Sequence, residues 1–413
     1  MANNYPINTL IARRALQILR NETPLINVVN KDYQADISKQ QAKNGGIINI
    51  SKPPRYTGRD GELMKVESTV MPTVSMALTQ SGQDVSFSLT DLQLTADGVR
   101  NGGADMFLKP IVASIASKVE ANGTALYRQV ATSVGSTSAQ PTSTTGISTA
   151  RAYITAAGGM ASNKVALLDP FVDSSLADSL KLVYAPSDTI SDIYKSGVMK
   201  GRGYGFTFYE EAFTQTHTAG VYGGIPQVNG AGQTGSFLVT NGWTAGSILN
   251  AGDTFTISGV FSINPQTRQS SGKLKFFVVS ATTTADGSGN MTIPLGENGI
   301  VTSAQFQSVS NSPGTGAAGA ITVTSGASGV SSKQSLLMDP SAFTFACVPM
   351  ATVPGGKGVI SSDTVSDEES GMSITMTQFY DGPTNQVMTR FDVLYAWLAT
   401  YPELAVRYQS PAS

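Results

Sequence analysis

Residues 104–134, ADMFLKPIVASIASKVEANGTALYRQVATSV, are the stretch that decides how the rest of the sequence is interpreted. Its apolar residues recur mostly at intervals of four: Phe107, Ile111, Ile115, Val119, Leu126 and Val130. Such a stripe is what an α-helix buries along one side. Lys118, Glu120 and Arg128 lie off the stripe and are expected to face solvent, and Asn122-Gly123 is a weak point. We therefore predict a spine helix of roughly 45 Å, along which the flanking segments pack.

The composition limits the classes of function. Of the 413 residues, 40% are hydrophobic and 14% are charged, against a usual charged share of about 25%. The net charge of −2 gives no global case for nucleic-acid binding. A single Cys347 excludes an internal disulfide, and a single His217 excludes most histidine-based zinc sites. We expect no cofactor, no signal peptide, no membrane span and a protein made in the cytoplasm.

The two ends of the chain carry opposite charge. Residues 1–65 hold ten basic against five acidic residues, a net of +5, and residues 358–413 hold two against seven, a net of −5. Residues 8–20 predict a short amphipathic helix that carries Arg13 and Arg14. Such a helix either docks on its own domain or acts as an arm that reaches a neighbour, and the sequence leaves both interpretations open.

Between residues 46 and 90 the hydrophobic period changes from four to two. Val74, Met76 and Leu78 alternate with polar or small residues, which indicates a strand with one apolar face. Pro53-Pro54 forbids a central strand there and marks an extended segment. We predict a long, thin β-excursion with a basic tip formed by Lys52, Arg55 and Arg59. Such an excursion has little core of its own, so it is expected to lean on another surface.

The second half of the chain predicts an interrupted domain. After a linker at 135–146, a helix near 149–157, a strand at 164–168, helices at 173–182 and near 189–194, and a strand at 204–209 suggest a helix-covered sheet. Residues 222–335 then hold 19 of the 42 glycines and only seven charges, with short strands near 236–240, 254–257, 274–280, 291–294 and 321–324. This predicts an inserted all-β sandwich or small barrel. A helix-covered sheet resumes with residues 335–349, followed by strands at 373–380 and 386–395.

No motif indicates catalysis. Residues 314–319 spell G-x-G-x-x-G, but a strand rather than a helix is expected to follow, so a glycine loop is favoured over a dinucleotide site. His217 is interpreted as an exposed loop residue, and Cys347 as a small buried hydrophobe. The acidic run at 367–369 is interpreted as a solvated turn rather than a cation site.

The order of parts and four short stretches resemble one family. Residues 336–346 (LLMDPSAFTFA), 380–381 with 390–395 (YD and RFDVLY), 402–405 (PELA) and 252–260 (GDTFTISGV) carry the resemblance. Together they are similar to the major capsid proteins of tailed bacteriophages, which have the Hong Kong 97-type fold. The inserted β domain looks most like that of short-tailed phages of the Salmonella P-twenty-two kind.

The resemblance implies an α+β capsid fold with an N-terminal arm, an extended β-loop, a long spine helix, an α/β axial domain and an inserted small β-barrel. The expected divisions are an arm at 1–45, the β-loop at 46–90, a peripheral domain with the spine helix at 91–146, the first part of the axial domain at 147–221, the insertion at 222–335, and the completion of the axial and peripheral domains at 336–413.

The implied function is self-assembly into an icosahedral virion shell of pentamers and hexamers around double-stranded DNA, without sequence-specific binding. The resemblance also implies a scaffolding protein and a portal protein as partners, and it leaves open whether a decoration protein joins them. Our own hypothesis for contacts between copies names Lys52, Arg55, Arg59, Arg13 and Arg14. Two other classes remain as alternatives: a β-rich surface protein that binds carbohydrate through Trp243, Phe261 and Phe306, and a glycosidase that uses carboxylates alone.

Overall fold

The computed structural model describes residues 7–21, 23–32, 47–56, 61–64, 66, 69, 71–88, 105–159, 163–179, 197, 199, 201–302, 305–350, 359–367, 371–383 and 386–412. The chain forms two compact units, and each is described by itself. The first unit lies within residues 1–50, 73–123 and 343–398, and the second within residues 51–72, 124–342 and 399–413. Each unit is therefore assembled from three separate parts of the sequence.

The first unit is built on a twisted antiparallel sheet. Its strands are β18 (Phe343–Val348), β21 (Gln386–Ala399), β20 (Met372–Asp381) and β19 (Val359–Asp367), in that order, and β3 (Thr79–Ser88) pairs with β21. The β3 register runs from Thr79 opposite Tyr395 to Ser88 opposite Gln386. A separate hairpin joins β1 (Ile47–Ser51) to β2 (Thr73–Ala77). Ile50 and Val74 of this hairpin pack with Val348 and Leu398 in one apolar core.

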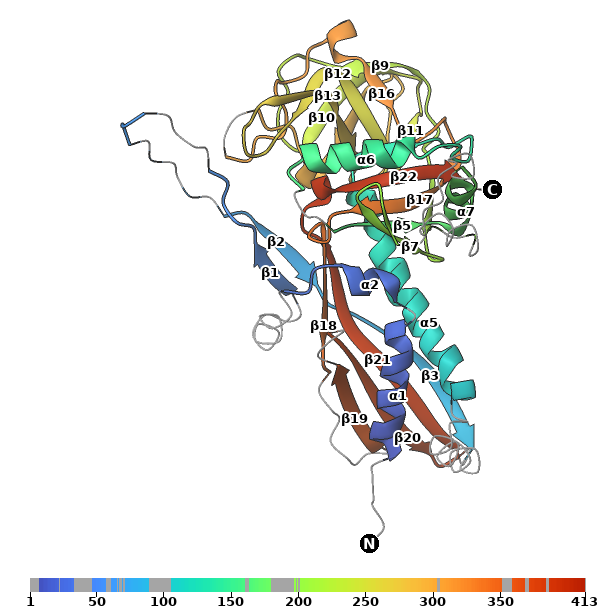
Figure 1. Cartoon of the computed structure of the whole chain (residues 1–413). Helices are drawn as coiled ribbons and strands as arrows, with labels where there is room; N and C mark the ends of the chain where they lie inside the picture. The colour runs from blue at the N-terminus through green and yellow to red at the C-terminus, as the bar shows by residue number, and fades with distance from the viewer. Residues whose placement is uncertain are drawn as a thin grey trace. The chain divides into compact units, whose positions relative to one another are not determined.

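The spine helix α5 (Asp105–Thr124) lies along this sheet beside β3 (Figure 1). Ile111, Ile115 and Val119 are buried, as the sequence predicts. The α-helix ends at Thr124 rather than near 134, and a short 3₁₀ turn, η1 (Ala125–Gln129), follows. Gly123 allows close packing there, because a β-carbon would lie 2.7 Å from the Trp397 ring. The last turn of the helix thus lies close against Leu25 and Trp397.

The prediction that Glu120 faces solvent is wrong. Glu120 is fully buried, and its Oε1 accepts a hydrogen bond from the Ile26 backbone N–H at 3.3 Å. Ile26 lies in α2 (Pro24–Val28), a five-residue helix that begins with proline. The first turn of a helix has N–H groups without helical partners, and a carboxylate there satisfies one of them. Lys118 and Arg128 are exposed, as predicted.

The N-terminal helix α1 (Ile7–Asn21) packs against β19 and β20. Its buried side includes Ile11, Ala15 and Leu19, whereas Arg13 and Arg14 are exposed. The helix is therefore docked on its own unit, and Arg13 and Arg14 face outward.

The second unit contains a mixed seven-stranded sheet. Its order is β4 (Ser133–Gly135), β22 (Ala405–Pro411), β17 (Ser331–Met338), β5 (Lys164–Leu168), β7 (Phe206–Glu210) and β6 (Arg202–Gly203), and β8 (Gln215–Thr218) pairs with β17. All five residues of β5 are buried, as expected for a central strand. Helices α6 (Thr145–Ala156) and α7 (Pro170–Ser179) bury Ile154 and Leu176 against the sheet core.

The predicted β domain follows β8 and ends before β17. It contains β9 (Gly224–Val228), β10 (Phe237–Trp243) and β15 (Met291–Pro294) in one sheet, and β12 (Thr254–Ile263), β13 (Ser270–Val278) and β16 (Ile321–Val323) in another, with the short pair β11 (Ile248–Leu249) and β14 (Thr283–Thr284). Its core contains Trp243, Phe255 and Phe277. The strands that lead into and out of this domain pair with each other, with Gln215 opposite Gln334 and Thr218 opposite Ser331. A two-stranded stem thus carries the insertion.

Most predicted elements appear near their predicted positions, because each has a clear hydrophobic period. The strand at 164–168 is found with the predicted bounds. Residues 335–349, where the helix-covered sheet is expected to resume, contain the end of β17 and all of β18. The helix predicted near 189–194 lies outside the described residues, as do two of the three acidic residues at 367–369. The described part of the chain also contains the 3₁₀ turns η3 (Gly296–Asn298), η4 (Gly316–Gly319) and η5 (Pro402–Leu404).

Candidate functional site

Two groups of residues are candidates for function, and the first is the loop formed by residues 51–72. In the sequence this loop connects β1 to β2, and Figure 1 draws its described residues without a helix or strand beyond Ser51. The Lys52 backbone N–H donates to the Pro72 carbonyl oxygen at 2.8 Å, which holds the two ends of the loop together. We call residues 52–56 and 71–72 the loop stem and residues 61–64 and 66 the loop tip.

Two of the three predicted basic residues, Lys52 and Arg55, lie in the stem rather than at the tip. Arg55 Nη2 donates to Glu403 Oε1 at 2.8 Å, and the Arg55 guanidinium lies 5.6 Å from the centre of the Phe306 ring. Lys52 Nζ lies 3.8 Å from Glu297 Oε2 and 5.7 Å from the centre of the Tyr401 ring. Arg59 lies outside the described residues. Two of the three predicted cations thus contact acidic side chains of their own chain.

The loop tip instead carries three exposed apolar side chains. Leu63 is 89% exposed, Met64 82% and Val66 79%. Large apolar side chains that are this exposed on a thin segment are typical of an interaction surface. In the sequence, the prolines and cations predict the stem. The apolar residues Leu63, Met64 and Val66 indicate an exposed apolar surface in the same loop.

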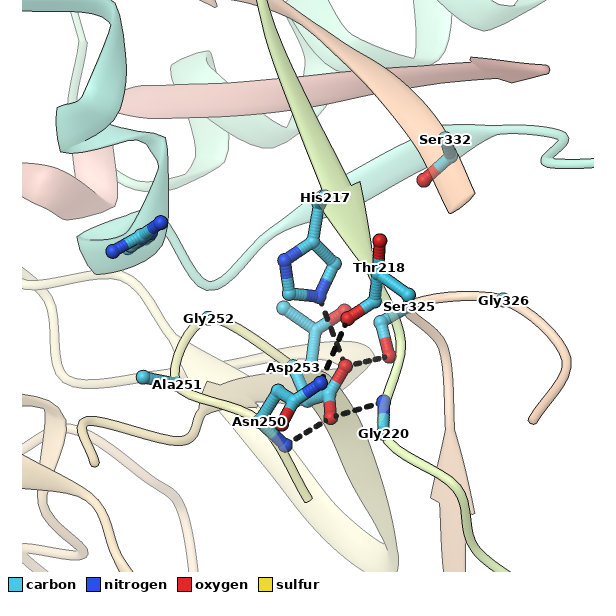
Figure 2. Close-up of polar contacts among 12 residues, drawn as sticks. His217, Thr218, Gly220, Asn250, Ala251, Gly252, Asp253, Ser325, Gly326 and Ser332 are labelled. Carbon is cyan, nitrogen blue, oxygen red and sulfur yellow. Dashed lines mark hydrogen bonds and ion pairs between the residues drawn. The ribbon is translucent and has the colours of Figure 1, made fainter. Parts of the chain in front are cut away.

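The second group is a buried polar cluster around Asp253, which we call the anchor cluster: Tyr127, His217, Asp253, Ser325 and Arg407. Figure 2 shows the Asp253 carboxylate at its centre. Oδ1 accepts hydrogen bonds from His217 Nε2 at 2.9 Å and Ser325 Oγ at 2.8 Å. Oδ2 accepts from the backbone N–H groups of Gly220 at 3.0 Å and Asn250 at 2.6 Å. Asp253 is fully buried, so these four donors replace the water that a carboxylate would otherwise bind.

Two further members connect the cluster to the mixed sheet and to η1. The Tyr127 hydroxyl lies 3.2 Å from His217 Nδ1. Arg407 of β22 donates from Nη1 to the Gly252 carbonyl oxygen at 2.8 Å, and its guanidinium lies 5.6 Å from the centre of the Tyr127 ring. Burial lowers the pKa of Arg407 to about 10, against the opposing effects of Tyr127 and Asp253, so this side chain remains charged at neutral pH.

The anchor cluster joins the insertion to the sheet that carries it. Gly220 lies where the chain enters the insertion, Ser325 lies where it leaves, and both donate to the same carboxylate. The prediction that His217 is an exposed loop residue is wrong, because His217 is 3% exposed and lies in β8. The cluster thus links the two chain segments that flank the strands of residues 224–323.

Asp173, a buried carboxylate outside both groups, makes the stability of the chain depend on pH. Asp173 of α7 is 2% exposed, and its Oδ2 accepts a hydrogen bond from the Met199 N–H at 3.0 Å. Burial raises the pKa of Asp173 from 3.8 to about 6; the hydrogen bond from Met199 opposes this rise, and the negative charge of Glu210 adds to it. The folded chain thus favours the protonated acid, and this stabilising contribution is complete below pH 3.8 and is lost as the pH rises through 6.

We therefore expect Asp173→Asn to gain stability relative to the unchanged chain as the pH rises from 4 to 8. The difference in the free energy of unfolding should change by at most about 3 kcal/mol over this range. Urea unfolding at several pH values measures it, and Asp178→Asn, at an exposed position in the same helix, is the control. A difference that does not vary with pH would contradict the prediction.

Other predicted features have plain structural roles. Cys347 is buried, as predicted, and burial raises the pKa of its thiol. Residues 316–319 of the glycine motif form η4, and strand β16 follows it. Trp243 is 4% exposed and donates from Nε1 to Thr240 Oγ1, and Phe306 contacts Arg55, so these two aromatic residues do not form an exposed sugar platform.

The described residues contain neither a cluster of three or more metal-ligating side chains nor a helix that is long and apolar enough to cross a membrane.

Comparisons with known proteins give one family. The profile described as "P22 coat protein - gene protein 5" matches residues 1–407. A search of curated proteins finds no match. Similar solved structures include that of Mycobacterium phage Che8, with 11% identity over 94% of this chain and 90% of that chain and a TM-score of 0.43. The capsid of Ralstonia phage GP4 has 10% identity over 89% and 84%, with a TM-score of 0.43. The mature capsid of bacteriophage PhiM1 has 11% identity over 89% and 83%, with a TM-score of 0.39.

Proposed function

From the premise that this chain belongs to the P22 coat protein family, and is a major capsid protein of a tailed phage that forms the icosahedral shell of the virion, we propose roles for its parts. The match over residues 1–407 is the observation that carries the function, since it includes almost the whole chain. The protein is thus a structural component, and its partners are first of all copies of itself.

We propose that the architecture is the Hong Kong 97-type fold with the divisions expected from the sequence: an arm, an extended β-loop, a peripheral domain with the spine helix, an axial domain and an inserted β domain. The long helix α5 beside a β-sheet supports this proposal. So does the pairing of β8 with β17, because it brings together the two chain segments that flank the insertion.

We propose further that the loop of residues 51–72 reaches a neighbouring copy in the shell. The exposed apolar tip supports this role, because these side chains lose their contact with water only when another surface covers them. Arg13 and Arg14 on the exposed side of α1, together with Arg59, are the charged residues proposed to contact neighbours. The scaffolding protein, the portal protein, a decoration protein and packaged DNA are proposed as further partners on family grounds alone.

Electron microscopy of the expressed protein tests the function. We expect closed shells or large curved polymers, which arise because each copy covers the exposed surfaces of the next. Size-exclusion chromatography on the same sample measures the size of the particles that the images show. A protein that remains a monomer or a small ring under all conditions, including in the presence of the phage's other assembly proteins, would contradict the proposal.

A further inference from the structure

The loop stem is held by several contacts within its own chain. The Lys52 N–H is bonded to the Pro72 carbonyl, Arg55 is bonded to Glu403, and the Arg55 guanidinium faces the Phe306 ring. Glu403 lies in η5 and Phe306 lies in the insertion, so Arg55 connects the stem to two separate segments of the second unit. A basic residue of the N-terminal region thus meets an acidic residue of the C-terminal region within one molecule.

We infer that Arg55 is a clamp that acts within its own chain, and that it holds the loop in the conformation in which its tip is presented to a neighbouring copy. This inference rests on the proposed role of the loop in contacts between copies. It differs from our initial hypothesis for Arg55, in which this residue binds acidic side chains of another copy. A pair within one chain and a pair between two copies predict opposite results when the charges of Arg55 and Glu403 are exchanged.

The surroundings of Arg55 make the clamp stronger than an ordinary surface ion pair. The side chains of Arg55 and Glu403 are only 30% and 28% exposed, and the Phe306 ring adds a cation–π contact. Glu297, the partner of Lys52, is 64% exposed, so that second ion pair contributes little. Arg55 is therefore the residue on which the clamp depends.

A clamp of this kind promotes assembly without touching the partner. A free loop of about twenty residues loses conformational entropy when it binds, and that loss reduces affinity. Holding the stem in place beforehand removes part of this cost. Loss of Arg55 is then expected to slow assembly even though no contact between copies is lost.

Charge exchange in single chains and in mixtures tests the inference. The variants are Arg55→Glu, Glu403→Arg, the double variant on one chain, and an equal mixture of the two single variants. We expect each single variant to assemble about tenfold more slowly in light-scattering measurements, the double variant to recover, and the mixture to remain slow. Recovery in the mixture would show that the pair forms between copies and would overturn the inference.

Hydrogen exchange in the unassembled chain provides a second, independent measurement. The Lys52 amide reports whether the stem is closed, so Arg55→Glu should raise its exchange rate about tenfold and the double variant should restore it. Lys273→Glu, an equal charge reversal at an exposed position on the insertion, is the control and should change neither measurement. An unchanged Lys52 rate in Arg55→Glu would also overturn the inference.

The two proposals can fail separately. If replacements at the loop tip leave assembly unchanged while the Lys52 amide still responds to Arg55→Glu, the clamp exists and the proposed tip contact is wrong. If the tip replacements block assembly while the Lys52 amide does not respond, the tip contact stands and the clamp is wrong.

Discussion

Replacing Asp253 by asparagine is expected to lower the free energy of unfolding of the second unit by about 3–5 kcal/mol. The replacement has nearly the same shape, so it creates no cavity. It converts one carboxylate oxygen into an NH₂ group, which would face donors such as the Gly220 and Asn250 N–H groups or the Ser325 hydroxyl. A buried donor that loses its acceptor costs about 1–3 kcal/mol, and several are affected at once.

Tryptophan fluorescence during urea unfolding measures this effect. The chain has two tryptophans, and Trp243 lies in the core of the insertion, so a Trp397→Phe background makes the signal specific for that domain. Asp286→Asn is the control, because Asp286 also accepts backbone N–H groups in the same domain but is exposed. Equal unfolding midpoints for the two variants would show that the anchor cluster does not hold the insertion.

Loss of the Asp253 carboxylate should also separate the unfolding of the insertion from that of the sheet. Because the same carboxylate binds donors at the beginning and the end of the insertion, its loss should release the insertion from the sheet before the sheet itself unfolds. Hydrogen exchange should then show faster exchange in residues 224–323 at urea concentrations where β5 and β17 remain protected. Simultaneous exchange of both regions would instead indicate a single cooperative unit.

Local periodicity explains why much of the fold could be predicted. The strand at 164–168 is an apolar run, the spine helix has a clear stripe, and the insertion has a distinct composition of glycine with few charges. Each of these signals lies within a few tens of residues. The predicted helix is longer than α5, because the apolar stripe that predicts it continues through Leu126 and Val130, whereas residues 125–129 form the 3₁₀ turn η1.

The candidate sites could not be predicted because they depend on contacts between distant segments. The buried Glu120 carboxylate accepts a hydrogen bond from the Ile26 N–H, 94 positions away in the sequence. Arg55 donates to Glu403, 348 positions away. His217 and Asp253 are 36 positions apart, but the intervening strands decide that they meet. A charged residue in a sequence is by default expected at the surface, and only the tertiary fold shows which ones have buried partners.

Replacing Leu63 and Met64 together by serine is expected to abolish or strongly slow shell assembly while the unassembled chain remains equally stable. Both side chains are more than 80% exposed in the single chain, so they contribute little to its folding. If a neighbouring copy buries them, each contributes about 1.5–3 kcal/mol to the contact. Loss of both then weakens each contact between copies by a factor on the order of 100 or more.

Light scattering during assembly and urea unfolding of the unassembled chain provide the two measurements. Glu62→Gln is the matched control, because it changes an exposed residue of the same loop without removing apolar surface. The effect should be confined to assembly, because the single chain does not bury these side chains. In a shell, every copy would have the same weakened contact. Normal shells from the double variant would place the contacts between copies elsewhere, whereas a lowered unfolding midpoint would show that the tip packs against its own chain.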